Sequence, residues 1–166
     1  MNTLRTSAAA LLLLLCAIAL PAQAVTGTGP APSLPTVTVQ MGYDLGYNVK
    51  NAKVGSSFDM SLLLTLTDSL QAGVTFLNGD GSQFAGYQLL DLYYSFLPRV
   101  GTLLSIGSET AAGTAVAGLG VYSNVIGRNA GGVQTGLRLL VDYLAPLGSG
   151  FTSGTFRLGI VAWVGV

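Results

Sequence analysis

The chain has 166 residues and no net charge, and only 8% of its residues are charged, against about 25% in ordinary soluble proteins. It has no histidine and one cysteine, which removes the commonest general base, the commonest metal ligand and any internal disulfide. A neutral chain also lacks the basic surface that nucleic acids require. We therefore expect no enzymatic activity, no catalytic residue, no cofactor, no metal and no nucleic-acid partner.

Residues 1–24 have the pattern of a signal peptide. Arg5 supplies the positive start, an apolar run follows, and Ala22-Gln23-Ala24 gives the small-x-small cleavage pattern. An uncleaved membrane anchor is the alternative, although the run is short of the ~20 residues of a spanning helix. We predict Sec-type export and cleavage, which leaves about 140 residues, enough for one domain.

Residues 25–35 are rich in Pro, Gly and Thr and lack periodicity, which predicts a flexible periplasmic tail. From residue 36 onward the hydrophobicity alternates with a period of two, as in strands that have one apolar face. The pattern predicts eight strands, of which the fifth and sixth are rich in Gly and Ala and less sharply bounded. They fall at about 36–49, 58–67, 70–76, 89–96, 102–108, 114–125, 133–143 and 155–166.

Short turn sequences separate these runs. Asp68-Ser69 predicts a tight turn, and Asn78-Gly79-Asp80-Gly81 predicts a hairpin turn with glycines at left-handed positions. Short connections between successive strands favour antiparallel pairing of neighbours.

Low charge without a long apolar run is typical of a membrane β-barrel, in which lipid-facing and lumen-facing residues alternate. No segment after residue 24 reaches the ~18 apolar residues of a spanning helix. We predict an all-β fold, a single antiparallel up-and-down transmembrane β-barrel of about eight strands, over residues 36–166. A secreted β-sandwich or fibre subunit that buries both faces against other chains is an alternative.

Six charged residues in the predicted strands fall on the polar face of their own strand: Asp44, Asp59, Asp91, Arg138, Asp142 and Arg157. Because Arg or Lys on the lipid face costs ~2–4 kcal/mol at the midplane, we place all of them in the lumen. The register predicts Arg157 beside Asp142 and, after closure, beside Asp44, with Arg138 reaching Asp91. We interpret the cluster as structural, fastening a narrow lumen, with a polar path or gate as the alternative.

Apolar residues share the inward face with these charges and predict a plugged lumen: Leu63, Leu89, Tyr93, Val116, Tyr122, Leu140 and Trp163. Outward aromatic residues gather toward the strand ends, as in the interfacial girdles of membrane barrels. One group is Tyr43, Tyr47, Phe58, Phe76, Tyr143 and Phe156, and the other is Tyr94 and Phe96. The core of a soluble β-sandwich is the alternative interpretation of these aromatics.

The eight-strand layout, with a last strand that alternates up to Val166, resembles the small outer-membrane β-barrels, the class of OmpX and the OmpA transmembrane domain. The resemblance implies residence in a Gram-negative outer membrane, among its lipids, with periplasmic chaperones and the barrel-assembly machinery as partners during biogenesis. Lipid A acylases and deacylases of this size use histidine, which this chain lacks. We expect a structural, envelope-integrity or interaction role, with a small porin or channel as the alternative.

Overall fold

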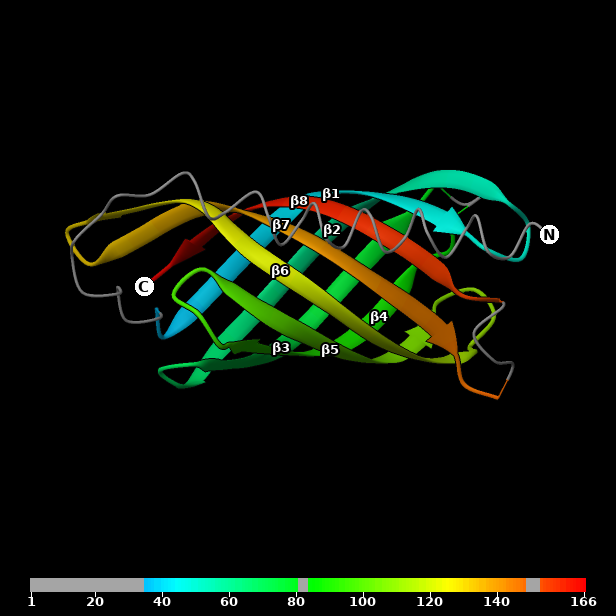
Figure 1. Cartoon of the computed structure of the whole chain (residues 1–166), viewed down its shortest axis with the longest axis horizontal. Helices are drawn as coiled ribbons and strands as arrows, with labels where there is room; N and C mark the ends of the chain where they lie inside the picture. Colours follow the sequence, from blue (N-terminus) through cyan, green and yellow to red (C-terminus); the bar gives the residue numbers. More distant parts are fainter. Residues whose placement is uncertain (1–34, 81–83, 149–152) are drawn as a thin grey trace.

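The structure, a computed structural model, describes residues 35–80, 84–148 and 153–166. The predicted signal peptide and residues 25–34 of the predicted tail lie outside these ranges. Eight antiparallel strands pair in chain order and the first pairs with the last, so the sheet closes into a barrel (Figure 1). The predicted all-β, eight-strand antiparallel barrel is therefore confirmed. The strands are β1 (Val37–Asn48), β2 (Lys53–Thr67), β3 (Leu70–Gly79), β4 (Tyr87–Ser95), β5 (Val100–Glu109), β6 (Ala115–Ala130), β7 (Val133–Pro146) and β8 (Thr155–Gly165).

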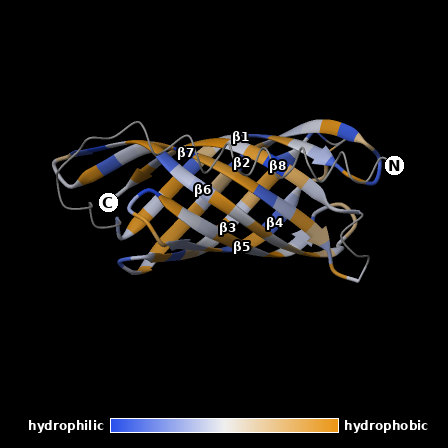
Figure 2. Cartoon of the chain, viewed as in Figure 1, coloured by the Kyte–Doolittle hydropathy of each residue, from blue (hydrophilic) through white to orange (hydrophobic). Residues whose placement is uncertain are grey.

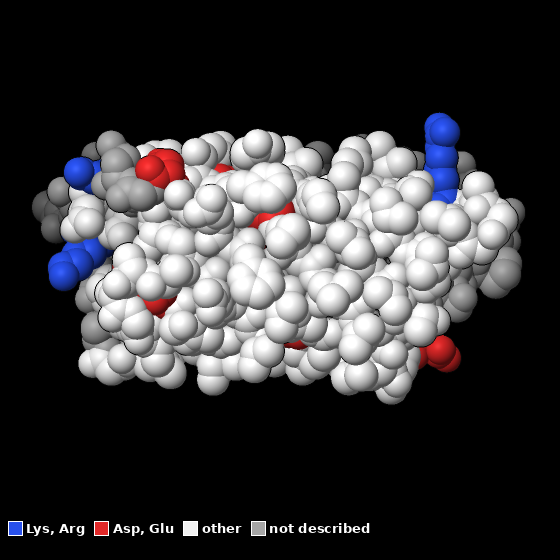
Figure 3. Space-filling view, turned by 180° about the vertical axis from the view of Figure 1, so that it is seen from behind, with Lys and Arg blue, Asp and Glu red and all other residues white. Residues whose placement is uncertain are grey.

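Alternation along each strand separates an apolar outer surface from a mixed interior. In β2, Leu62 and Leu64 are exposed, whereas the intervening Leu63 is fully buried. Apolar and polar residues accordingly alternate along the strands in Figure 2. On the face shown in Figure 3, Lys and Arg lie only at the two ends of the cylinder. Within the described ranges, no helix is both long and apolar enough to cross a membrane.

Barrel closure joins the two ends of the described chain. The β1–β8 ladder runs antiparallel from Thr38, opposite Gly165, to Asn48, opposite Thr155. Beyond it, Val37 and Val166 exchange two backbone hydrogen bonds, each 3.0 Å long. Pairing of β1 with β8 leaves no open edge along this seam, which satisfies backbone groups that an apolar surrounding could not.

The connection between β3 and β4 differs from the predicted hairpin turn over residues 78–81. Asn78 and Gly79 stay paired with β2, so β3 continues to Gly79, and β4 begins only at Tyr87. The Asp80 carboxylate accepts backbone hydrogen bonds from Ser56, at 3.2 Å, and from Phe84, at 3.1 Å. These bonds to the neighbouring strand and to the returning chain favour a wider connection over a tight turn; Gly81 lies outside the described residues.

The β6–β7 hairpin extends beyond the rest of the barrel (Figure 1). A register shift between Asn124 and Ile126 marks a bulge, after which β6 continues to Ala130 rather than ending near residue 125 as predicted. Gly131 and Gly132 form the two-residue turn at φ of 60° and 87°, a left-handed conformation that glycine adopts without strain. The last paired residue of β5 on this side is Val100, opposite Ser123. Within the part of the chain that the structure describes, the outer part of β6 is thus paired on one edge only.

Candidate functional site

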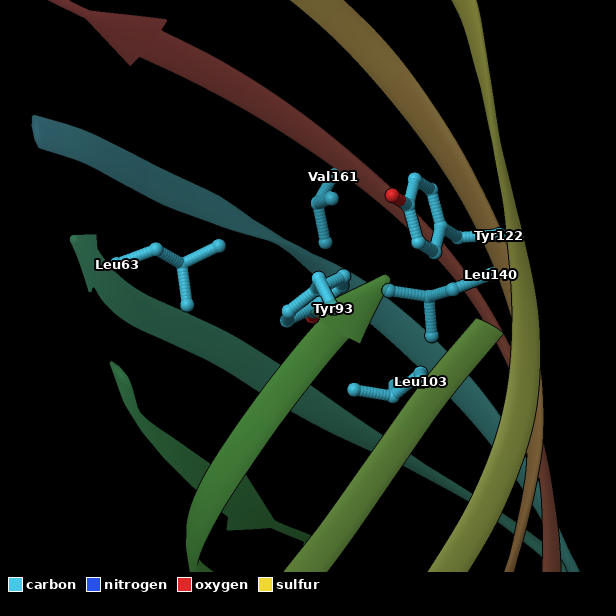
Figure 4. Packing of buried hydrophobic residues seen from close by; sticks show 6 residues of the cluster. All are labelled: Leu63, Tyr93, Leu103, Tyr122, Leu140 and Val161. Atoms are coloured by element: carbon cyan, nitrogen blue, oxygen red, sulfur yellow. The ribbon is translucent and has the colours of Figure 1, made fainter. Parts of the chain in front are cut away.

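Two clusters of buried apolar side chains occupy the barrel interior. One consists of Leu77, Phe84, Tyr87, Leu89, Val116 and Leu144. The other consists of Leu63, Tyr93, Leu103, Tyr122, Leu140 and Val161 (Figure 4). Along β4 the inward side chains are Leu89 of the first cluster, then Asp91, then Tyr93 of the second. Apolar side chains therefore lie on both sides of a layer of charged groups, which we call the charge layer and which consists of Asp44, Asp59, Asp91, Asp142 and Arg157.

Phe84 enters the first cluster from the β3–β4 connection. Its ring lies 6.0 Å from that of Tyr87 and fills the space that a side chain on Gly46 would occupy. Gly46 and Gly55 are cross-strand partners, and the Cβ of Phe84 lies against Gly55. Sequence alternation missed Phe84 because it lies outside any strand. The sequence feature that could have indicated Phe84 is the pair of inward-facing glycines, Gly46 and Gly55. Without side chains they leave a space on the inner surface of the barrel, which we call the glycine notch.

All six charged residues that the sequence pattern places in the lumen are buried. Each is between 1% and 3% exposed, and the set is Asp44, Asp59, Asp91, Arg138, Asp142 and Arg157. A random arrangement of charges on the two strand faces would have left some of them on the apolar exterior. Their common burial follows from the cost of placing charge against lipid.

Arg157 joins three strands across the closure seam. Its Nε donates to Asp142 Oδ1 at 2.8 Å and its Nη2 contacts Asp142 Oδ2, so β7 and β8 are linked by a two-point pair. Its Nη1 lies 3.4 Å from Asp44 Oδ2 on β1. Gly159, opposite Asp44 in the ladder, makes room for this group, because a side chain there would overlap Asp44 Oδ1. The predicted neighbours of Arg157 thus meet it on both sides.

Arg138 does not reach Asp91, contrary to the sequence-based prediction. Its Nε donates to Asn124 Oδ1 at 2.8 Å on the adjacent β6. The guanidinium lies 4.8 Å from the ring centroid of Tyr93 and 4.6 Å from that of Tyr122. Two aromatic faces attract the cation in place of a carboxylate. The prediction was wrong because strand parity fixes the face of a residue and not its level along the barrel axis.

Hydroxyl groups also contact three of the carboxylates, those of Asp44, Asp59 and Asp91. Ser57 Oγ lies 3.3 Å from Asp44 Oδ2. Asp59 on β2 and Asp91 on β4 are bridged through two hydroxyls, those of Ser61 and Thr75, whose oxygens lie 2.9 Å apart. The charge layer thus contains two hydrogen-bonded groups, one around Arg157 and one that runs from Asp59 to Asp91. Within the described residues, no set of three or more His, Cys, Asp or Glu side chains is arranged to hold a metal ion.

The outer surface carries aromatic contacts toward one end of the barrel. The rings of Tyr43 and Phe58 lie 5.4 Å apart on β1 and β2, and those of Tyr143 and Phe156 lie 4.5 Å apart on β7 and β8. Tyr43 is 70% exposed, so it faces the surroundings and not the core. An aromatic rim on an apolar cylinder is typical of barrels that meet a membrane interface.

No family model matches the chain, and no curated protein matches it. One similar solved structure comes from work described as "De novo design of transmembrane beta-barrels". It is 16% identical in sequence, with a TM-score of 0.50, and the match covers 81% of this chain and 99% of the designed one. A likeness at this identity concerns the fold alone. The chain has the fold of a transmembrane β-barrel, which indicates a membrane location.

Proposed function

We propose that this chain is an outer-membrane β-barrel protein with a structural, envelope-integrity or interaction role and a lumen closed to solutes. The observation that carries the proposal is the charge layer held between two apolar clusters. In the second of these clusters Leu63, Leu103 and Val161 are fully buried. An eight-stranded barrel has an interior just wide enough for its own side chains, which favours a closed lumen over a pore.

The exterior and the start of the chain support the outer-membrane location. The described outer face is apolar with an aromatic rim, and residues 1–24 have the pattern of a cleaved signal peptide. We place the chain, by its resemblance to small outer-membrane barrels, in a Gram-negative outer membrane as part of this proposal. Its proposed partners during biogenesis are periplasmic chaperones and the barrel-assembly machinery. The absence of histidine supports a non-enzymatic role.

Conductance in planar bilayers tests the closed lumen. We expect the wild-type barrel to insert without producing discrete channel openings. Replacing Tyr93, which is 1% exposed and central in the second apolar cluster, by alanine should produce an ion leak. Tyr94→Ala is the matched control, because Tyr94 faces outward and its loss leaves the interior filled.

Steady channel openings by the wild-type protein would contradict the closed lumen and favour the small porin. Location is tested separately by fractionating cells that express the full chain. The protein is expected in the outer-membrane fraction, beginning at residue 25. Recovery from the soluble periplasmic fraction would instead favour the secreted β-sandwich or fibre subunit.

A further inference from the structure

Four buried side chains form a continuous line of oxygen atoms across β2, β3 and β4. Ser61 Oγ lies 2.8 Å from Asp59 Oδ1 and 2.9 Å from Thr75 Oγ1. Thr75 Oγ1 lies 2.5 Å from Asp91 Oδ2. All four residues are at most 3% exposed. Each of the three contacts has the oxygen–oxygen distance of a hydrogen bond.

The number of hydrogens in this line does not match the number of contacts. Every hydrogen bond needs one hydrogen between its two oxygens, and each hydroxyl supplies one. Ser61 and Thr75 therefore supply two hydrogens for three contacts, and ionised carboxylates supply none. If both aspartates were ionised, one pair of oxygens would face each other with lone pairs only. A third hydrogen on Asp59 or Asp91 completes the line.

The surrounding charges leave this line without a cation of its own. Arg157 is paired with Asp142 and Asp44, and Arg138 lies between the rings of Tyr93 and Tyr122. The nearby charged groups are thus Asp44 on β1, Asp142 and Arg138 on β7, and Arg157 on β8, with the Tyr93 hydroxyl on β4 as a further titratable group. Two further buried carboxylates without their own cation would be costly in a dry interior.

A second observation concerns the far side of Asp91. Its Oδ1 atom is buried and has no hydrogen-bond partner within 3.5 Å, and the nearby group on this side is the hydroxyl of Ser105, its cross-strand partner on β5. Ser105 is 6% exposed, so this side of Asp91 is shielded from bulk water. Asp91 therefore faces hydroxyl groups and no cation. Such surroundings favour the neutral form of one carboxyl of the pair.

We propose that Asp59 and Asp91 bind a single proton between them, held through the hydroxyls of Ser61 and Thr75 in the charge layer. With the proton on Asp59, hydrogens point from Asp59 to Ser61, from Ser61 to Thr75 and from Thr75 to Asp91. Shifting each of the three hydrogens to the neighbouring oxygen reverses the line and puts the proton on Asp91. Atoms and charge are the same in both arrangements. The site thus binds one proton and leaves one negative charge shared by the two residues.

Infrared spectroscopy of the full mature barrel with isotope-labelled aspartate tests the site directly. We expect the carbonyl band of a protonated aspartic acid at neutral pH in wild-type protein. Asp59→Asn and Asp91→Asn should each abolish the whole band, because the asparagine amide supplies the third hydrogen and the remaining aspartate can ionise. Asp68→Asn makes the same change at an exposed turn and should leave the band unchanged.

The outcomes separate a shared proton from its alternatives. A wild-type spectrum without the band overturns the proposal and needs no variant to fold. A band that each asparagine variant only halves also overturns it, since each carboxyl would then hold its own proton. A band absent in sodium buffer but present when a bulky organic cation replaces sodium would assign the site to a metal cation instead.

Proton linkage gives an independent readout. The unfolded aspartates titrate near pH 3.9, so at neutral pH the folded barrel binds one proton more than the unfolded chain. Stability should therefore fall as pH rises, with the unfolding equilibrium constant increasing about tenfold per pH unit while the site stays protonated. Either asparagine variant should remove this dependence, and Asp68→Asn should keep it. A wild-type constant that does not change with pH would overturn the proposal.

Discussion

At the scale of single residues, Arg157 is the side chain that links β7, β8 and β1 at the closure seam. It holds Asp142 on one side and Asp44 on the other with almost no exposure to water. Removing one partner from a buried ion pair typically costs ~3–5 kcal/mol, because the other charge stays behind uncompensated. We expect Arg157→Ala to lower the free energy of unfolding by about that amount, measured by urea titration of barrels folded in lipid.

Arg128→Ala is the matched control, since Arg128 lies exposed on the outer part of β6. Exposed substitutions away from special features usually change stability by no more than ~0.5 kcal/mol. Equal urea midpoints for the two variants would contradict the role given to Arg157.

Phe84 offers a second residue-scale prediction. Loss of a buried phenylalanine typically costs ~3–5 kcal/mol, and the glycine notch at Gly46 and Gly55 has no side chain that could refill the space. We expect Phe84→Ala to destabilise the barrel by this order, whereas Phe96→Ala, at an outward and half-exposed position, should cost less. Thermal unfolding, monitored by the change in gel migration, measures the loss of stability in each variant. A larger effect at Phe96 would show that the notch is unimportant.

Parity of the strands was enough to predict that all six charged residues turn inward, because every second residue shares a face. Parity also placed Arg157 correctly with Asp142 and Asp44, since these pairings lie within one ladder or across its closure. It failed for Arg138 and Asp91, which belong to strands that are not neighbours. The relative positions of two residues along the barrel axis, when their strands are not neighbours, depend on the register shifts of all the strand pairs between them. No local sequence pattern encodes the sum of these shifts.

At the scale of elements, the β6–β7 hairpin differs from the other seven neighbouring pairs. Among the described residues, no strand pairs with the outer edge of β6 beyond Asn124. Unpaired backbone groups are not tolerated in the hydrocarbon core, so this extension should lie outside it.

Hydrogen exchange can locate the point at which the pairing changes. In β6 up to Ser123 both edges are paired, so amides there should be strongly protected. After Asn124 the amides that face away from β7 should exchange much faster, while those bonded to β7 stay protected. Mass spectrometry of the barrel in micelles, with fragmentation inside β6, would show an alternating pattern. Uniform protection to Ala130 would contradict an edge without a partner.

Two places, one in β6 and one at the end of β3, explain why some strand boundaries could not be predicted. β1, β7 and β8 alternate clearly, and their predicted bounds are close to those observed. β6 is rich in glycine and alanine, and its bulge shifts the alternation by one residue near Val125, so a regular period of two stops there. Asn78 and Gly79 have turn composition, yet pairing with β2 keeps them in a strand. Tertiary pairing overrode local preference in both places.

At the scale of the whole molecule, the apolar exterior makes a prediction that separates a membrane barrel from a soluble one. Leu90 lies near the middle of β4 and is 61% exposed. In lipid, arginine at the midplane should cost ~2–4 kcal/mol, falling to ~0–1 kcal/mol near the interface. We expect Leu90→Arg to show the larger cost and Gln88→Arg, outward at the end of the same strand, the smaller one.

Folding free energies in vesicles measure this difference. If the outer surface faced water, both arginines would be tolerated equally, since surface changes there are usually within ~0.5 kcal/mol. A small cost at Leu90 would therefore contradict membrane embedding of this face.

The hydrogen bonds between Val37 and Val166 close the described sheet into a ring of strands. In such a ring the chain ends could lie at a different hairpin without changing which strands are neighbours. A short glycine linker could join residue 166 to residue 36 as an ordinary hairpin, and the Asp68-Ser69 turn could be cut to give new ends. We expect this circular permutant to close into the same cylinder, with compact gel migration before heating and slower migration after it. A permutant that inserts but never becomes compact would mean that synthesis order, and not strand pairing alone, guides closure.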